Sequence, residues 1–292
     1  MVRRVAYLAA TVGVLFALAG CALSIFGYEK RAAWRDQEER ACMSARAVVM
    51  SAWEAPQRRI DSRGACGIDR PLKVSAMQSG TVSIGPTAML GCPMTAAVEN
   101  WLSTAVQPAA IAWFGEPVVA IKQISAYACR PRNNEAGERL SEHAFGNALD
   151  VAGFQLADGR SVTVKHDWSL GDQNERSFLR EVFAAACERF KTVLGPGVKY
   201  HGDHFHLDLA HHNAAGTSRY CRPLPDGPPP RRAPYTPGLF ARAGAFFDWN
   251  RTGSIAPAPQ EPGELLTEAP DDVIARQIQG ADGAYELQPG AD

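Results

Sequence analysis

Hydrophobic residues of this 292-residue chain recur at helical spacing in two long segments, residues 93–114 and 174–194. Apolar residues three and four positions apart line one face of a helix, so both segments are predicted to be helices, the first interrupted at Pro108. Residues 29–56 are charged and rich in alanine, contain no glycine and have a proline only at their end. This composition predicts a third helix.

Other segments follow the period of two that is typical of strands. Residues 72–89 alternate weakly between glycine and proline breaks, which predicts short strands. Residues 118–127 form a β-branched run that predicts a central strand, and residues 160–168 follow an Asp158-Gly159 turn that predicts a hairpin arm. Residues 130–140 are polar and predict a loop. This mixture of helices and strands predicts an α+β fold.

The N-terminus has the pattern of an export signal. Arg3 and Arg4 precede an apolar run from residue 5 to residue 27. The run contains Leu18-Ala19-Gly20-Cys21, which resembles the lipobox of bacterial lipoproteins, and its length of about 23 residues also allows an uncleaved transmembrane helix. Either a lipidated Cys21 or such a helix would make residues 1–28 a membrane anchor. Both alternatives leave the rest of the chain on the periplasmic side of the cell envelope.

Composition separates a central domain, residues 29–222, from a tail. Residues 223–292 are rich in proline, glycine and alanine, and we expect them to be mostly disordered, with one apolar island at residues 239–249 that suggests a docking helix. The chain is 46% hydrophobic and has a net charge of -1. These values predict a packed core and give no indication of nucleic-acid binding.

Seven cysteines are present, one of them in the leader. The other six are far apart in sequence, and in an exported domain they predict three disulfides, whereas a cytosolic chain would keep them as thiols. Proximity along the chain suggests the pairs Cys42–Cys66, Cys92–Cys129 and Cys187–Cys221.

Side chains able to bind a metal concentrate in residues 141–150 and 201–209. His143 and Asp150 cannot share an ion from one straight helix, because seven helical residues span roughly 10 Å. The first segment must therefore bend, and Gly146 permits the bend. In the second segment, histidine and aspartate alternate with phenylalanine and leucine, which predicts a strand with its polar side chains on one face.

The first segment fills the pattern S-x-H-x-x-G-x-A-x-D with Ser141, His143, Gly146, Ala148 and Asp150. Together with Asp203 and His206 it resembles the D-Ala-D-Ala carboxypeptidase (LAS) superfamily of zinc peptidases. Tyr127-Ala128-Cys129-Arg130 and the phrase from His204 to Asp208 resemble the bacterial extensin-like C-terminal domain family, over roughly residues 40–222.

The resemblance implies a small antiparallel sheet flanked by helices, with the metal on its open face. It implies zinc bound by His143, Asp150 and His206, and Asp203 as the general base. His204 is a second candidate for the base, because it lies on the strand face of His206. The family's arginine corresponds to either Arg130 or Arg132, which would bind a substrate carboxylate or stabilise an oxyanion.

Three further residues have alternative roles. Ser141 either hydrogen-bonds substrate or braces the turn before His143. His201 either orients a ligand or lies in a loop, and Asp208 either shares the site or is solvated at the strand end. His166, His211 and His212 are expected to be surface residues.

By this resemblance we expect an exported, membrane-anchored zinc peptidase that acts on peptides of the bacterial cell wall. The alternatives are a non-catalytic metal-containing module that binds wall peptide or a protein partner, and a structural envelope protein whose tail docks a partner. The sequence lacks H-E-x-x-H, G-x-S-x-G, P-loop and G-x-G-x-x-G motifs.

Overall fold

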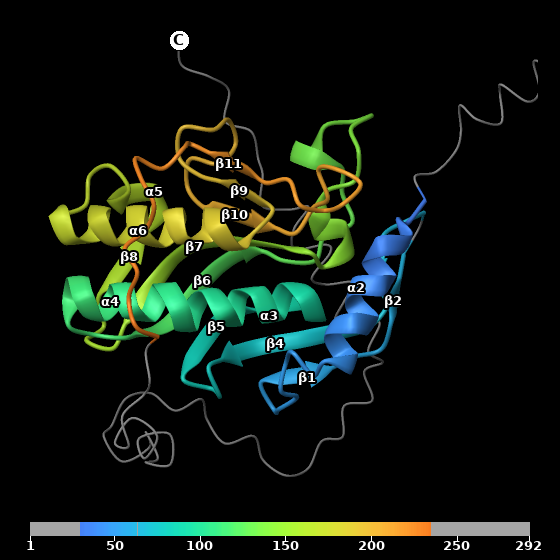
Figure 1. The fold of residues 1–292 in the computed structure, drawn as a ribbon, viewed down its shortest axis with the longest axis horizontal. Coiled ribbons are helices and arrows are strands. Elements are labelled where there is room, and N and C mark those ends of the chain that lie inside the picture. Colours follow the sequence, from blue (N-terminus) through green and yellow to red (C-terminus); the bar gives the residue numbers. More distant parts are fainter. Residues whose placement is uncertain (1–29, 63, 235–292) are drawn as a thin grey trace, which may run out of the picture. The chain divides into compact units, whose positions relative to one another are not determined.

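A mixed β-sheet lies at the centre of the structure, and helices cover one of its faces (Figure 1). The computed structural model describes residues 30–62 and 64–234. The nine-stranded sheet has the order β1-β4-β5-β6-β7-β10-β9-β11, with β8 paired to β7. The strands of this sheet are β1 (Glu54–Pro56), β4 (Pro71–Met77), β5 (Val82–Gly91), β6 (Val118–Ser125), β7 (Ala148–Leu156), β8 (Ser161–Thr163), β9 (Thr192–Leu194), β10 (Phe205–Asp208) and β11 (Tyr220–Arg222). A separate ribbon pairs β2 (Ile60–Asp61) with β3 (Gly67–Ile68).

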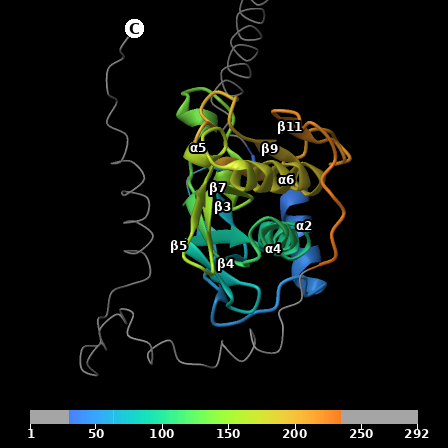
Figure 2. The same ribbon diagram turned by 90° about the vertical axis from the view of Figure 1, so that its left-hand side faces the viewer.

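Three long helices and several short ones accompany the sheet. The helical segments are α2 (Ala33–Ser44), α3 (Cys92–Trp101), the π-helical η1 (Leu102–Val106), α4 (Gln107–Phe114), the 3₁₀ turns η2 (Arg132–Asn134) and η3 (Glu142–Phe145), α5 (Val164–Asp167) and α6 (Gln173–Arg189). Figure 2 views α4 nearly end-on and shows α4 and α6 on the same side of the sheet.

The predicted α+β class is confirmed, but the expectation of a small antiparallel sheet is wrong. The sheet is mixed, because β5 pairs with β6 and β9 with β11 in parallel. Parallel neighbours need a long crossover, and the α3-η1-α4 segment between β5 and β6 supplies one. The same segment explains the interruption expected at Pro108, since a π-helical turn precedes this proline near the start of α4.

Two predicted helices are shorter than their sequence patterns. The helix expected over residues 29–56 covers only Ala33–Ser44, and residues 54–56 instead pair with β4 as β1. The helix expected over residues 174–194 ends at Arg189, because residues 192–194 pair with β10 as β9. The hairpin arm at 160–168 is likewise a strand only at Ser161–Thr163, before α5. For the two helices, pairing with a neighbouring strand outweighs local helix propensity, whereas residues 164–167 of the expected hairpin arm are helical.

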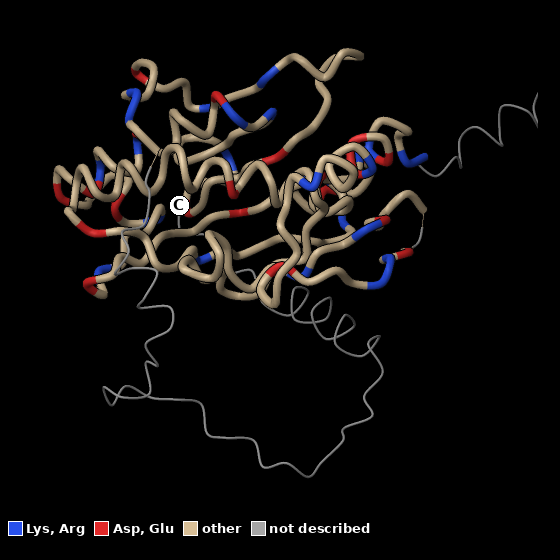
Figure 3. Tube along the Cα trace, turned by 60° about the horizontal axis from the view of Figure 1, so that its bottom comes forward, with Lys and Arg blue, Asp and Glu red and all other residues tan. Residues whose placement is uncertain are grey.

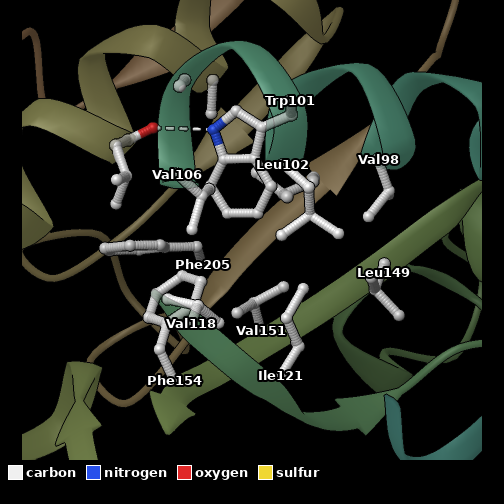
Figure 4. Close-up of a cluster of buried hydrophobic side chains, with 14 of the residues drawn as sticks. Val98, Trp101, Leu102, Val106, Val118, Ile121, Leu149, Val151, Phe154 and Phe205 are labelled. Carbon is white, nitrogen blue, oxygen red and sulfur yellow. Dashed lines mark hydrogen bonds between the residues drawn. The ribbon is translucent and has the colours of Figure 1, made fainter. Parts of the chain in front are cut away.

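The core lies between the helices and the sheet face that they cover. Trp101, fully buried, donates its indole N–H to the carbonyl of Val182 at 3.0 Å and packs near Phe154 (Figure 4). From β10, Phe205 packs against Phe183 of α6 with ring centroids 5.1 Å apart. Burial of each such large side chain contributes about 1.5–3 kcal/mol. Alternate residues of β10 therefore point away from the helices, and these are the polar ones.

Three disulfides are present, which confirms their expected number, but two of the suggested pairs are wrong. The bonds join Cys42 to Cys92, Cys66 to Cys129 and Cys187 to Cys221. Proximity along the chain failed for the first four cysteines because α2 packs beside the start of α3, which brings two distant cysteines together.

Lysine, arginine, aspartate and glutamate occur on many elements, with both signs distributed along the trace (Figure 3). Among the residues that the structure describes, no helix combines the length and apolar character needed to cross a membrane. The expected anchor at residues 1–28 and the expected docking helix at residues 239–249 lie outside the described residues.

Candidate metal centre

Two neighbouring strands bring together the first pair of candidate ligands. β7 and β10 are antiparallel, and their register sets His206 directly opposite Asp150. Directly opposed residues point to the same face of a sheet. Leu149, Val151 and Phe205 occupy the helix-covered face, so the carboxylate and the imidazole lie on the other one.

The third candidate ligand comes from a tight turn before β7. The hydroxyl of Ser141 accepts a hydrogen bond from the backbone N–H of His143 and caps η3. Gly146 ends this turn with φ 60° and ψ 26°, a left-handed conformation that favours glycine. The sequence-based expectation of a bend at Gly146 is confirmed, and the bend directs the chain from His143 into β7.

The three side chains converge on one point. Their ligand atoms all lie within 4.8 Å of one another. His143 Nε2 is 3.3 Å from His206 Nδ1 and 3.1 Å from Asp150 Oδ2, and His206 Nδ1 is 2.8 Å from Asp150 Oδ1. Ligands on a tetrahedral zinc ion, with bonds of about 2.0–2.1 Å, are separated by about 3.3 Å. The spacing thus suits a small cation, although ligation itself stays a prediction.

In each candidate histidine ligand, a hydrogen bond to one ring nitrogen determines that the other nitrogen faces the point where the three side chains converge. His143 Nδ1 donates to the backbone carbonyl of Ala126 at 2.6 Å, which leaves Nε2 with its lone pair toward Asp150. His206 Nε2 donates to Asp208 Oδ2 at 2.9 Å, which leaves Nδ1 toward Asp150. Such partners are typical of metal-binding histidines, because they set the tautomer and the orientation of the ring.

Without a cation these groups would be three acceptors facing one another, so the protein must hold a proton among them. Burial alone would lower the pKa of His206, but its hydrogen bonds to Asp150 and Asp208 raise it to about 10. Burial alone would raise the pKa of Asp150, but His143 and His206 hold it well below its ordinary value. A metal ion would replace the proton, since a ligating imidazole must be neutral at the bound nitrogen.

Asp208 belongs to this centre, which decides between the two alternatives left open by the sequence. Its side chain is buried and bonds both His206 and the backbone N–H of Ala210. The sequence signal for this position was the alternation of His204, His206 and Asp208, which predicts that Asp208 lies on the same strand face as His206.

The two candidates for the general base are in contact with each other. His204 Nδ1 is 2.8 Å from Asp203 Oδ1, and His204 Nε2 is 3.7 Å from Asp150 Oδ1. The Asp203 side chain is 52% exposed, whereas that of His204 is 11% exposed. His204 therefore lies between Asp203 and the ligands. His201 is also buried, with its ring centroid 5.2 Å from that of His204, and burial lowers its pKa.

The candidate substrate-binding residues lie on the chain that enters the turn. The backbone N–H of Ser141 donates to the carbonyl of Arg130, and the N–H of Arg132 donates to the carbonyl of Arg139. Within residues 30–62 and 64–234, neither the half-buried Arg130 nor the exposed Arg132 uses its guanidinium in a hydrogen bond or ion pair. Both remain available for a ligand, so the choice between them stays open.

Sequence reasoning missed several residues around the centre. Ala126 acts through its backbone carbonyl, which has no sequence signature. Glu142 is buried and bonds Arg35 of α2, a contact across more than a hundred residues. His211, expected to be a surface residue, stacks on Trp34 with centroids 3.8 Å apart. The side chain of His166 is 65% exposed, as expected.

The model of the family described as "Extensin-like protein C-terminus" matches residues 40–222, so this chain belongs to that family. The matched range contains β7, β10 and the whole metal centre. No curated protein and no solved structure matches the chain.

Proposed function

We propose that this extensin-like protein is an exported zinc-dependent peptidase that acts on peptides of the bacterial cell wall. One observation carries the proposal: His143, Asp150 and His206 converge on a single point, and each imidazole has a hydrogen bond that turns its free nitrogen toward that point. The motif resemblance to the D-Ala-D-Ala carboxypeptidase superfamily supplies the reaction class and the substrate.

The donor set fits zinc. Two imidazole nitrogens and one carboxylate oxygen are ligands that zinc accepts, and three protein ligands are usual where the ion is catalytic. His143, Asp150 and His206 would hold the ion. A bound zinc ion would supply Lewis acidity, which polarises a scissile carbonyl and lowers the pKa of a water molecule.

Side chains beside the ligands would then transfer the proton that the attacking water molecule releases. Asp203 is the general base implied by the motif, and His204 is its rival. Their 2.8 Å contact supports a linked pair, in which Asp203 orients His204 and His204 Nε2 faces the ligands. In that arrangement His204 holds the proton in transit to the leaving amine, and the Asp203 carboxylate stabilises the charged imidazolium.

Substrate recognition would fall to residues on the approach to η3. The guanidinium of Arg130 or Arg132 is free to bind the carboxylate of a wall peptide through two parallel hydrogen bonds. Ser141 already caps η3 through its hydroxyl, which favours bracing of the turn over substrate contact. Anchoring through a lipidated Cys21 or a transmembrane helix would hold the domain close to the wall.

The test is metal analysis of the full-length protein combined with incubation on purified peptidoglycan and its stem peptides, with products identified by mass spectrometry. We expect about one zinc per chain and peptide cleavage. His206→Ala should lose both zinc and activity. Asp203→Asn and His204→Ala should retain zinc and lose activity by about 100- to 10,000-fold, the usual contribution of a general base.

The variants also separate the assignments. Full activity of Asp203→Asn together with an inactive His204→Ala would assign the base to His204 alone. A wild-type protein that binds zinc and wall peptide but cleaves nothing would contradict the peptidase and favour the non-catalytic binding module. Absence of stoichiometric metal would refute the zinc site itself.

A further inference from the structure

We infer that helix α2 is a clamp that positions the metal-binding turn, and that Arg35 is its principal positioning residue. The inference rests on the proposed zinc site and adds a group that lies outside the ligand motif. α2 is blue in Figure 1, and its contacts with the turn cross more than a hundred residues of sequence.

The guanidinium of Arg35 contacts the residues at both ends of η3. Arg35 makes two hydrogen bonds to the carboxylate of Glu142, the first residue of the turn, at 2.5 and 2.6 Å. The same guanidinium carbon lies 3.8 Å from the ring centroid of Phe145, the last residue of the turn. His143 lies between these two contacts, so its backbone is held from both sides.

The carboxylate that Arg35 binds also fixes the exit of the turn. Glu142 Oε2 accepts a hydrogen bond from the side chain of Asn147 at 2.7 Å, and Asn147 returns a backbone hydrogen bond to the carbonyl of Glu142. Glu142 is only 6% exposed, so its charge needs a close partner, and Arg35 supplies it. Loss of Arg35 would leave this buried carboxylate without a positively charged partner, next to the candidate ligand His143.

α2 also contacts the chain that leaves the strand of His206. Trp34 stacks on His211 with an interplanar angle of 8°, and Glu38 Oε1 lies 2.8 Å from His211 Nε2. His211 follows the end of β10 by three residues. One helix therefore contacts both the turn that carries His143 and the chain that follows the strand of His206.

The helix is itself fixed to the scaffold. The Cys42–Cys92 disulfide joins α2 to the start of α3, and Arg31, two residues before α2, donates to the carbonyl of Gly67 at 2.7 Å. Gly91, which precedes Cys92, donates its N–H to the carbonyl of Gly146 at 2.8 Å. α2 and the exit of the turn thus share one anchor, so α2 can resist movement of His143.

Metal affinity measures this role directly. When a residue that holds metal ligands in position is removed, the metal affinity of a site falls by about 10- to 100-fold. We expect that loss for Arg35→Met in the full-length protein, measured by competition between the protein and a chromogenic zinc chelator. Replacement of zinc by cobalt should also give a visible absorption spectrum that differs from that of the wild type, because the position of His143 changes.

Arg40 supplies a matched control, because it lies exposed on the same helix and makes no side-chain hydrogen bond or ion pair within the described part of the chain. Arg40→Met should keep the wild-type zinc affinity and cobalt spectrum. Arg35→Lys keeps the positive charge but loses the two-pronged contact, so we expect an intermediate loss. If Arg35→Met does not fold, the zinc affinity of Arg35→Lys tests the inference in its place.

The outcomes distinguish the inference from the proposed function. A wild type that binds zinc, with Arg35→Lys and Arg35→Met matching it in affinity and cobalt spectrum, would overturn the clamp alone. A wild type without zinc affinity would overturn the zinc site and the clamp with it. Zinc weakened in the Arg35 variants and retained in Arg40→Met supports the clamp.

Discussion

Gly146→Ala tests the geometry of the turn η3 through stability, independently of any metal. Gly146 has φ +60°, where a side chain costs about 1–2 kcal/mol. A Cβ there would also lie 2.2 Å from Cδ1 of Ile68 and 3.1 Å from the backbone N of Gly91. Ile68 is 1% exposed, so its side chain has little free space to enter.

The two costs can be added. The backbone term of about 1–2 kcal/mol combines with an overpacking term of about 1–3 kcal/mol, which gives a loss of about 2–5 kcal/mol in the free energy of unfolding. A loss of this size is a large fraction of the 5–15 kcal/mol that is typical of domains.

Urea unfolding under non-reducing conditions measures the loss, with zinc chelated throughout so that metal binding does not contribute. Gly115 is the matched control, because it has φ +74° and nothing within 4 Å of the added Cβ. Gly115→Ala should show the backbone cost alone. Ile68→Val removes Cδ1, so the double variant with Gly146→Ala should be destabilised by less than the sum of the two single variants.

A loss for Gly146→Ala no larger than that for Gly115→Ala would refute the close approach of Ile68. Strict additivity with Ile68→Val would contradict the steric part of the argument and leave only the backbone term.

Three further predictions concern other parts of the domain. Asp208→Ala should lower zinc affinity by about 10- to 100-fold in chelator competition, because the His206 ring loses its hydrogen-bond partner; unchanged affinity would contradict this. Burial, reinforced by the charge of Glu99, raises the pKa of Glu54 from 4.5 to about 7. The folded state therefore keeps a proton that the unfolded chain releases, and the wild type should lose about 1–3 kcal/mol of stability between about pH 5 and about pH 8 that Glu54→Gln does not lose; parallel pH profiles from urea unfolding would refute it. Cys42→Ser opens a disulfide that spans 50 residues and should cost about 4 kcal/mol in the same assay, whereas a cost below about 1 kcal/mol would contradict a structural role for the bond.

The convergence of the candidate ligands was largely predictable from the sequence, because these residues lie in two short motifs. Period-two alternation set His206 and Asp208 on one strand face, and a glycine between His143 and Asp150 predicted the bend. These features depend on local backbone geometry, which a short stretch of sequence determines. The α+β class and the central strand at residues 118–125 follow from the same local periodicity.

Long-range partners were not predictable in this way. Arg35 and Glu142 are separated by 107 residues, and nothing in the local pattern of either segment indicates the other. The disulfides of Cys42 and Cys66 likewise depend on how α2 and the β2–β3 ribbon pack, which proximity along the chain does not report.

The sequence by itself indicated the residues of the candidate site, the class of fold and the bend at Gly146, because those follow from side-chain type and local periodicity. Only the tertiary structure decided the mixed sheet, the ring nitrogen that each histidine presents and the contacts between α2 and η3. The physical reason is that strand pairing, imidazole tautomers and buried ion pairs depend on partners from distant parts of the chain, which packing of the core brings together.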